Sequence, residues 1–263
     1  MSDVLTKICA TTRNHVDALK SVTSHENLKQ LLKSAPAPRP FAANLMAAAR
    51  AGTGLIAEIK RASPSKGRIR DDFDAETLAR AYAAGGATCL SVLTDAPYFE
   101  GSNDYLVAAR AAVALPVLRK DFMLEPYQIT ESRVIGADCV LLIMAALETA
   151  TAQALEAMAM DYGMSVLIEV HNAAELDEAL KLKSPLIGIN NRDLKTLRVD
   201  INTSFELSRQ VPGDRLVVAE SGIRDHADVA HFKANGVSAF LVGEALMRQD
   251  DVRVATRALL EGD

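Results

Sequence analysis

The chain has 263 residues, of which 49% are hydrophobic and 24% charged, with a formal net charge of −5 and a pI of about 5.6. This length suits two small domains or one closed α/β barrel, since such barrels use about 250 residues as a single unit. The composition is typical of a globular protein with a sizeable core, and the acidic balance excludes a basic surface for nucleic acid or an anionic membrane.

The first 50 residues differ in pattern from the rest of the chain. Two helical stretches, about Val4–Ser21 and Glu26–Lys33, end in the Pro-rich segment Ala35–Pro40, and a further helix is predicted around Ala42–Ala51. We therefore expect an N-terminal helical extension, residues 1–50, packed on a catalytic barrel of residues 51–263 and lying over one of its mouths. The alternative for the extension is a loose tail.

The remaining sequence repeats a short apolar run followed by a helical stretch. Eight β-branched or Leu-rich runs begin roughly 20 to 30 residues apart, which leaves room for one helix and two loops each. The predicted strands are Leu55–Lys60, Thr88–Leu93, Pro116–Lys120, Asp138–Ile143, Ser165–Val170, Leu186–Asn190, Leu216–Glu220 and Ala239–Val242. Eight parallel strands with helices between them predict an α/β fold of the (β/α)8, or TIM-barrel, type.

The segments between these runs have the spacing of amphipathic helices. Apolar residues recur every three or four positions opposite charged faces in Asp74–Ala84, Thr149–Tyr162, Ala173–Leu182 and His226–Ala234. Gly86, Gly136 and Gly236 each follow such a stretch, where glycine commonly supplies a left-handed residue after a helix. These segments are the predicted outer helices.

Polar residues gather at the carboxyl ends of the predicted strands. In such a barrel these ends line one mouth, so the side chains are expected to converge there. A single charged residue at a strand end is commonly just solvated, but several together are costly unless they pair or serve a ligand. The residues are Glu58, Lys60, Arg119, Lys120, Asp121, Glu169, Asn190, Arg192, Glu220 and Ser221. The cluster predicts a site of acid–base chemistry.

The last two strands are each followed at once by a glycine. Gly222 follows Glu220-Ser221, and Gly243 precedes Glu244, where a helix is predicted to begin. Glycine permits close approach of backbone N–H groups, and a helix start favours an anion, so the turns predict a phosphate site. The alternative is that both glycines only make tight turns. The cationic segment Lys60–Arg68 is a second candidate for attracting an anion.

These residues together resemble the indole-3-glycerol-phosphate synthase family. The similarity runs in order from about residue 4 to 250 and combines strand-end residues that other phosphate-binding barrels lack. It is carried by residues Glu58–Ser65, Ser91–Asp95, Tyr98–Ser102, Leu118–Phe122, Leu167–Val170, Ile187–Leu194 and Ala219–Ile223. The resemblance implies a lyase of tryptophan biosynthesis that converts 1-(2-carboxyphenylamino)-1-deoxyribulose 5-phosphate by ring closure, decarboxylation and dehydration. It implies no cofactor and no metal.

The resemblance also implies roles for the acid and base residues. Lys120 resembles the general acid that protonates the ribulose carbonyl. Lys60 resembles the lysine that binds the anthranilate carboxylate and acts as an acid in dehydration, and Glu58 shares its face and can orient it. Glu169 resembles the base that removes a proton.

Further residues are implied to bind substrate. Asn190, Arg192, Glu220 and Ser221 resemble a polar ring that holds substrate hydroxyls or tunes the lysines. Phe122 is expected to pack against the aromatic part of the substrate, and Phe99 is expected to bind substrate. The phosphate is expected at backbone groups of Gly222, Gly243 and Glu244, with help from Ser63. Some members of the family carry Ser in place of Glu244.

The sequence leaves two alternative functions open. An isomerase-like barrel of the same pathway, acting on phosphoribosylanthranilate, is expected to use a Cys and Asp pair, and a non-catalytic barrel that only binds a phosphorylated ligand needs no acid–base set. We expect one partner, a small phosphorylated substrate, with no nucleic acid and no membrane, and a monomeric chain. The three cysteines, Cys9, Cys89 and Cys139, lack disulfide or metal spacing, which predicts a cytoplasmic location.

Overall fold

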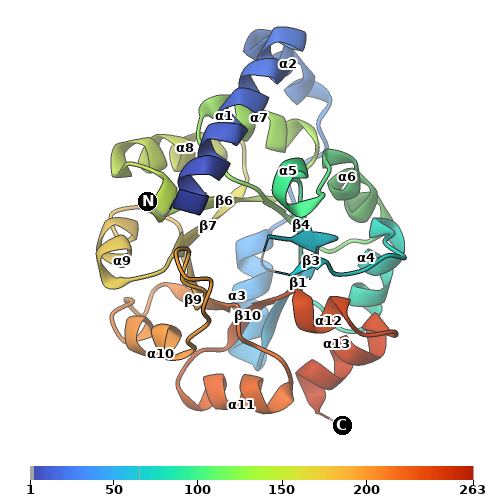
Figure 1. The fold of residues 1–263 in the computed structure, drawn as a ribbon, viewed down its shortest axis with the longest axis vertical. Helices are drawn as coiled ribbons and strands as arrows, with labels where there is room; N and C mark the ends of the chain where they lie inside the picture. The colour runs from blue at the N-terminus through green and yellow to red at the C-terminus, as the bar shows by residue number, and fades with distance from the viewer. Residues whose placement is uncertain (1–2, 65, 263) are drawn as a thin grey trace.

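Eight parallel strands form a closed barrel in the computed structural model, which describes residues 3–64 and 66–262 (Figure 1). Around the barrel, neighbours follow the order β1-β10-β9-β8-β7-β6-β5-β4. The strands are β1 (Gly54–Ile59), β4 (Cys89–Leu93), β5 (Val117–Lys120), β6 (Cys139–Ile143), β7 (Ser165–Val170), β8 (Leu186–Asn190), β9 (Leu216–Glu220) and β10 (Ala239–Val242). The predicted (β/α)8 fold is confirmed, with strand bounds that differ by at most one residue at either end. Ser65 of the first family motif lies outside the described residues.

Helices connect the strands and surround the barrel (Figure 1). The longer ones are α4 (Ala75–Ala84), α6 (Asn103–Ala112), α7 (Pro126–Val134), α8 (Thr149–Asp161), α9 (Ala173–Ala179), α10 (Asn202–Ser208), α11 (His226–Ala234) and α13 (Val252–Glu261). Short elements fill some loops: β2 (Ala62–Ser63), β3 (Gly67–Arg68), α5 (Ala96–Phe99), the 3-10 turn η2 (Met144–Ala146) and α12 (Glu244–Met247). Gly86, Gly136 and Gly236 have φ angles of 96°, 90° and 84°, as the sequence predicts.

Alternate strand residues point into the barrel and form layers. Ile56, Leu118, Leu167 and Val218 belong to the buried apolar cluster that fills the interior. The residues two positions further along the same strands are Glu58, Lys120, Glu169 and Glu220. Because the side-chain period of a strand is two, each of these polar residues lies directly above an apolar one, at the carboxyl end of the barrel.

The N-terminal segment contains α1 (Asp3–Val22), α2 (His25–Leu31), the 3-10 turn η1 (Leu32–Ser34) and α3 (Phe41–Ala51). Helix α3 packs against the amino ends of the strands, and its Phe41, Leu45 and Ala49 belong to the interior apolar cluster. Its first turn is held by a hydrogen bond of 3.1 Å from the Ala42 N–H to the Ser165 hydroxyl on β7. Helix α1 reaches the opposite end, because it contacts η2, which directly follows the carboxyl end of β6. The segment therefore contacts both ends of the barrel.

Within the described residues, no helix is both long enough and apolar enough to span a lipid bilayer.

Candidate active site

A cavity of about 1000 Å³ opens at the carboxyl ends of the strands. With the exception of Arg119, the residues that the sequence assigns to the site lie in its wall. These residues are Glu58, Lys60, Ser63, Phe99, Lys120, Phe122, Glu169, Asn190, Arg192, Glu220, Ser221, Gly222, Gly243 and Glu244. The strand phase therefore brings together side chains that are more than 180 positions apart in the chain.

Lys120 lines the cavity and lies between two carboxylates. Its Nζ is 2.6 Å from Glu169 Oε2 and 2.9 Å from Glu220 Oε2. Asn190 donates a hydrogen bond of 3.3 Å to the other oxygen of Glu169. Glu169 is 3% exposed and Glu220 2%, so these charges interact with little screening by water.

This arrangement decides which of the three groups carry protons. Burial disfavours the Lys120 ammonium, but the charges of Glu169 and Glu220 outweigh it and raise the pKa of Lys120 above its ordinary value. Burial also works against the ionised form of Glu169, yet Lys120 and a neighbouring histidine lower the pKa of Glu169. Burial and the Glu169 charge raise the pKa of Glu220, against the lowering effect of Lys120. Lys120 is thus a protonated acid beside an ionised carboxylate.

A second ion pair lies at the carboxyl end of β1. The Lys60 Nζ is 2.5 Å from Glu58 Oε1, and Glu58 is 3% exposed.

Two glycines make room for the carboxylates of the site. A Cβ atom at Gly243 would lie 2.5 Å from Glu58 Oε1, and one at Gly188 would lie 2.4 Å from Glu220 Oε1. Gly243 therefore has a packing role beside Glu58, which the sequence did not reveal.

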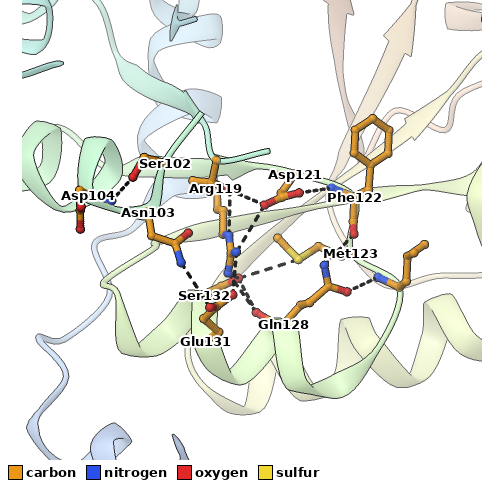
Figure 2. Close-up of polar contacts among 12 residues, drawn as sticks. Ser102, Asn103, Asp104, Arg119, Asp121, Phe122, Met123, Gln128, Glu131 and Ser132 are labelled. Atoms are coloured by element: carbon orange, nitrogen blue, oxygen red, sulfur yellow. Dashed lines mark hydrogen bonds and ion pairs between the residues drawn. The ribbon is translucent and has the colours of Figure 1, made fainter. Parts of the chain in front are cut away.

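Arg119 does not join the site. The prediction that its side chain converges on the mouth is wrong, because β5 directs Lys120 inward and its neighbour outward. The Arg119 guanidinium is buried between β5 and α7, 2.7 Å from Glu131 Oε2 and 3.1 Å from the Ser132 hydroxyl (Figure 2). Asp121 turns back toward this network and also lines the cavity.

One wall of the cavity is apolar. The rings of Phe99 and Phe122 lie 6.3 Å apart between centroids, and both line the cavity. Leu5 and Ile8 of α1 line it too, as do the β6 residues Leu141 and Ile143. No sequence pattern marks these four residues as part of a site. The three- and four-residue spacing of α1 predicts an apolar face, but not the surface that this face covers.

The predicted anion turn has an unusual backbone. Ser221 and Gly222 both have positive φ angles, 63° and 88°, and the left-handed conformation is costly for the non-glycine Ser221. The predicted helix at Glu244 exists but has only four residues, so its dipole is short. Cations supply further positive charge: Lys66 and Arg248 line the cavity and lie 3.7 Å and 3.1 Å from Glu244 Oε1.

The family model described as indole-3-glycerol phosphate synthase matches residues 5–259. The chain belongs to the indole-3-glycerol phosphate synthase family. Curated members include one from Azospirillum brasilense, 59% identical over 99% of this chain and 100% of its own length. Another, from Rhodospirillum rubrum, is 53% identical over 99% of this chain and 100% of its own length.

Membership of the indole-3-glycerol phosphate synthase family makes the chain a carboxy-lyase of tryptophan biosynthesis, so the isomerase-like and non-catalytic alternatives are set aside. Solved structures outside the family share the fold alone. A 3-hexulose-6-phosphate synthase from Salmonella typhimurium has a TM-score of 0.64 at 13% identity, covering 80% of this chain and 97% of its own. A thiamine phosphate pyrophosphorylase from Pyrococcus furiosus has a TM-score of 0.59 at 19% identity, covering 79% and 93%.

Proposed function

We propose that the cavity converts 1-(2-carboxyphenylamino)-1-deoxyribulose 5-phosphate into indole-3-glycerol phosphate, carbon dioxide and water, with Lys120 as the first acid. The observation that carries the proposal is the position of the Lys120 ammonium, which lines the cavity between Glu169 and Glu220. Together these groups supply a proton and a buried base in one place.

The first step is ring closure. The ring carbon that bears the carboxylate attacks the ribulose carbonyl carbon, a C–C bond forms, and the carbonyl oxygen takes a proton from Lys120. The carboxylate then leaves as carbon dioxide, and its bonding electrons return to the ring. After the transfer Lys120 is neutral and no longer offsets the charge of Glu169 and Glu220, each within 3 Å of its nitrogen. These two carboxylates therefore determine the free-energy cost of the proton transfer.

The second step is dehydration. The new hydroxyl leaves as water with a proton from Lys60, and Glu169 removes the proton from the carbon beside the nitrogen, which forms the double bond of the indole. Lys60 is suited to both of its proposed roles, because its ammonium is held by Glu58 yet lines the cavity. Before dehydration it binds the substrate carboxylate.

The two ends of the substrate fit opposite parts of the cavity. We place the aromatic ring against Phe99 and Phe122 and the phosphate at the backbone of Gly222, Gly243 and Glu244. Ser63 and the cations Lys66 and Arg248 lie in the same wall as the phosphate turn. Asn190, Arg192 and Ser221 are proposed to hold the substrate hydroxyls between the two ends.

The proposal extends to organisation and location. Residues 1–50 are proposed as an extension of the barrel of residues 51–263 that completes the apolar wall, supported by Leu5 and Ile8 in the cavity. One chain supplies every proposed site residue, which supports a monomeric enzyme. All three cysteines are buried and unpaired, which supports a cytoplasmic location.

The proposal is tested with the purified chain and the carboxyphenylamino-deoxyribulose phosphate, whose product has indole fluorescence. Lys120→Met is expected to lower kcat by about a thousandfold or more, since it removes the proton donor. The exposed Lys181, which pairs with Glu178 at the surface, gives the matched control Lys181→Met with wild-type turnover. Normal turnover in a folded Lys120→Met protein would remove Lys120 as the acid, and an inactive, folded wild type would remove the function.

A further inference from the structure

His171 follows β7 directly and lies between two carboxylates. Its Nε2 is 3.3 Å from Glu169 Oε1, and its Nδ1 is 3.0 Å from Glu175 Oε2 on α9. The same Glu175 oxygen accepts a hydrogen bond of 2.8 Å from the His171 backbone N–H, which fixes the loop. The His171 side chain is 8% exposed. It lies behind Glu169, outside the lining of the cavity.

The two carboxylates that face its opposite nitrogens favour the positively charged form of this ring. A neutral imidazole has one N–H and one lone pair, whereas an ionised carboxylate only accepts hydrogen bonds. A neutral His171 would therefore direct a lone pair at one of the two carboxylates, and only the doubly protonated ring suits both. Burial alone would lower the pKa of His171, but the contacts with Glu169 and Glu175 raise that pKa to about 10.

The second cation matters because Lys120 does not keep its charge. Glu169 has Lys120 on one oxygen, and His171 and Asn190 on the other. When Lys120 gives its proton to the substrate, the positive charge on that side disappears. Glu220, which also shares Lys120, is the neighbouring carboxylate with the raised pKa. The His171 cation, shielded from the cavity, then decides which carboxylate stays ionised.

We propose that His171 is a positioning residue, a permanently protonated imidazole that keeps Glu169 oriented and ionised after Lys120 has lost its proton. Glu169 is thereby free to accept a proton during dehydration. If one of the two carboxylates is protonated before that step, it is Glu220. The inference rests on the proposed role of Glu169 as the base. Without the His171 charge, Glu169 and Glu220 would compete for the same proton.

The charge of His171 is measured without reference to activity. In the full chain labelled with ¹⁵N-histidine, a long-range ¹H–¹⁵N correlation spectrum distinguishes the neutral from the doubly protonated ring, and His171→Asn identifies the signal. Both ring nitrogens of His171 are expected to be protonated from pH 6 to pH 8.5. In Glu169→Gln, the pKa of His171 is expected to fall, because one of its two partners loses its charge. A neutral His171 ring at pH 7.5 in the wild type would overturn the proposal.

The effect on Glu169 is measured by the pH profile of the single-turnover rate. Removing the positive charge raises the pKa of Glu169, so the acidic limb in His171→Asn is expected to move to higher pH. At pH 7 the rate is expected to fall by about tenfold, with substrate affinity changed less than about twofold. The exposed His231 on α11 gives the matched control His231→Asn, which is expected to keep the wild-type profile.

A second substitution separates charge from packing. His171→Gln retains a neutral hydrogen-bond donor and is expected to show the same shifted profile as His171→Asn. Restoration of the wild-type profile by His171→Gln would show that packing, rather than charge, is what His171 supplies, and would overturn the proposal. Glu169→Gln tests the proposed base by itself: a wild-type rate in that variant would remove Glu169 as the base, whereas the spectroscopic result on His171 would stand.

Discussion

Gln128 holds the backbone of Phe122 in place. Its side-chain amide donates a hydrogen bond of 2.8 Å to the Phe122 carbonyl oxygen, and its Oε1 accepts one of 2.8 Å from the Leu124 N–H (Figure 2). On the other side, Asp121 accepts a hydrogen bond of 2.8 Å from the Phe122 N–H. Side chains thus fix both backbone groups of the residue proposed to contact the aromatic part of the substrate.

Gln128→Ala is expected to weaken both folding and substrate binding. Gln128 is 2% exposed, so its loss leaves the part-buried Phe122 carbonyl and the buried Leu124 N–H without this partner and lowers the free energy of unfolding by about 1 to 3 kcal/mol. The Phe122 ring loses its fixed direction, so KM rises several-fold while kcat changes less. Urea denaturation and steady-state kinetics measure the two effects. The exposed Gln153→Ala is the control, and an unchanged KM in folded Gln128→Ala would contradict the assignment of Phe122.

Gly188→Ala is expected to lower activity by displacing Glu220. The added Cβ would lie 2.4 Å from Glu220 Oε1, and β8 is part of the closed barrel, so the carboxylate rather than the strand must move. A displacement of about 1 Å in a catalytic group can cost about 100-fold in rate, so kcat is expected to fall by ten- to a hundredfold. Gly213, where a Cβ meets nothing within 4 Å, provides the control Gly213→Ala with unchanged kcat. Equal activity in both variants would mean that Glu220 needs no fixed position.

The sequence was sufficient to predict the barrel and the members of the site because both depend on strand phase. Glu58, Lys120, Glu169 and Glu220 each lie two residues beyond a buried apolar residue, and this pattern is visible in the sequence. The same rule, applied to Arg119, directs it outward. The prediction that it converges on the mouth is wrong because adjacency to Lys120 in the sequence does not override the period of two.

Other parts of the site depend on contacts that no local pattern contains. The surface that α1 covers depends on how the whole helix packs on the barrel. The sequence therefore predicts that Leu5 and Ile8 lie on an apolar helix face, but not that this face lines the cavity. His171 did leave a signal: it lies two residues after Glu169 and four before Glu175. His171 lies just beyond the end of β7, and a histidine in the following loop has no distinctive pattern by itself.

Asp95 is expected to make stability depend on pH. Its carboxylate is 6% exposed and caps α5 by accepting a hydrogen bond of 2.8 Å from the Tyr98 N–H. Burial, helped by the nearby Asp121 charge, raises the pKa of Asp95 from 3.8 to about 6. Since the folded state then binds the proton more tightly than the unfolded state, this group lowers the free energy of unfolding as pH rises from 3.8 to about 6.

Asp95→Asn separates this effect from the cap. Asparagine keeps a capping oxygen but does not ionise, so the variant is expected to match the wild type near pH 4. Above pH 6 it is expected to be more stable by about 1 to 3 kcal/mol. Urea denaturation at pH 4, 5, 6 and 7 measures the difference. A stability difference that is the same at all four values would show that Asp95 is not held with a raised pKa.

Glu244→Ser is expected to strengthen phosphate binding. The Glu244 carboxylate pairs with Lys66 and Arg248, so it neutralises cations beside the proposed phosphate turn and repels an anion placed there. Serine removes that charge and keeps the backbone N–H. The dissociation constant for inorganic phosphate and the KM are each expected to fall several-fold at low salt, and the difference is expected to shrink as salt screens the charges. Glu206→Ser, a change of the same charge on α10, controls for net charge. A Glu244→Ser protein that binds phosphate no better than Glu206→Ser at any salt concentration would place the phosphate elsewhere in the cavity.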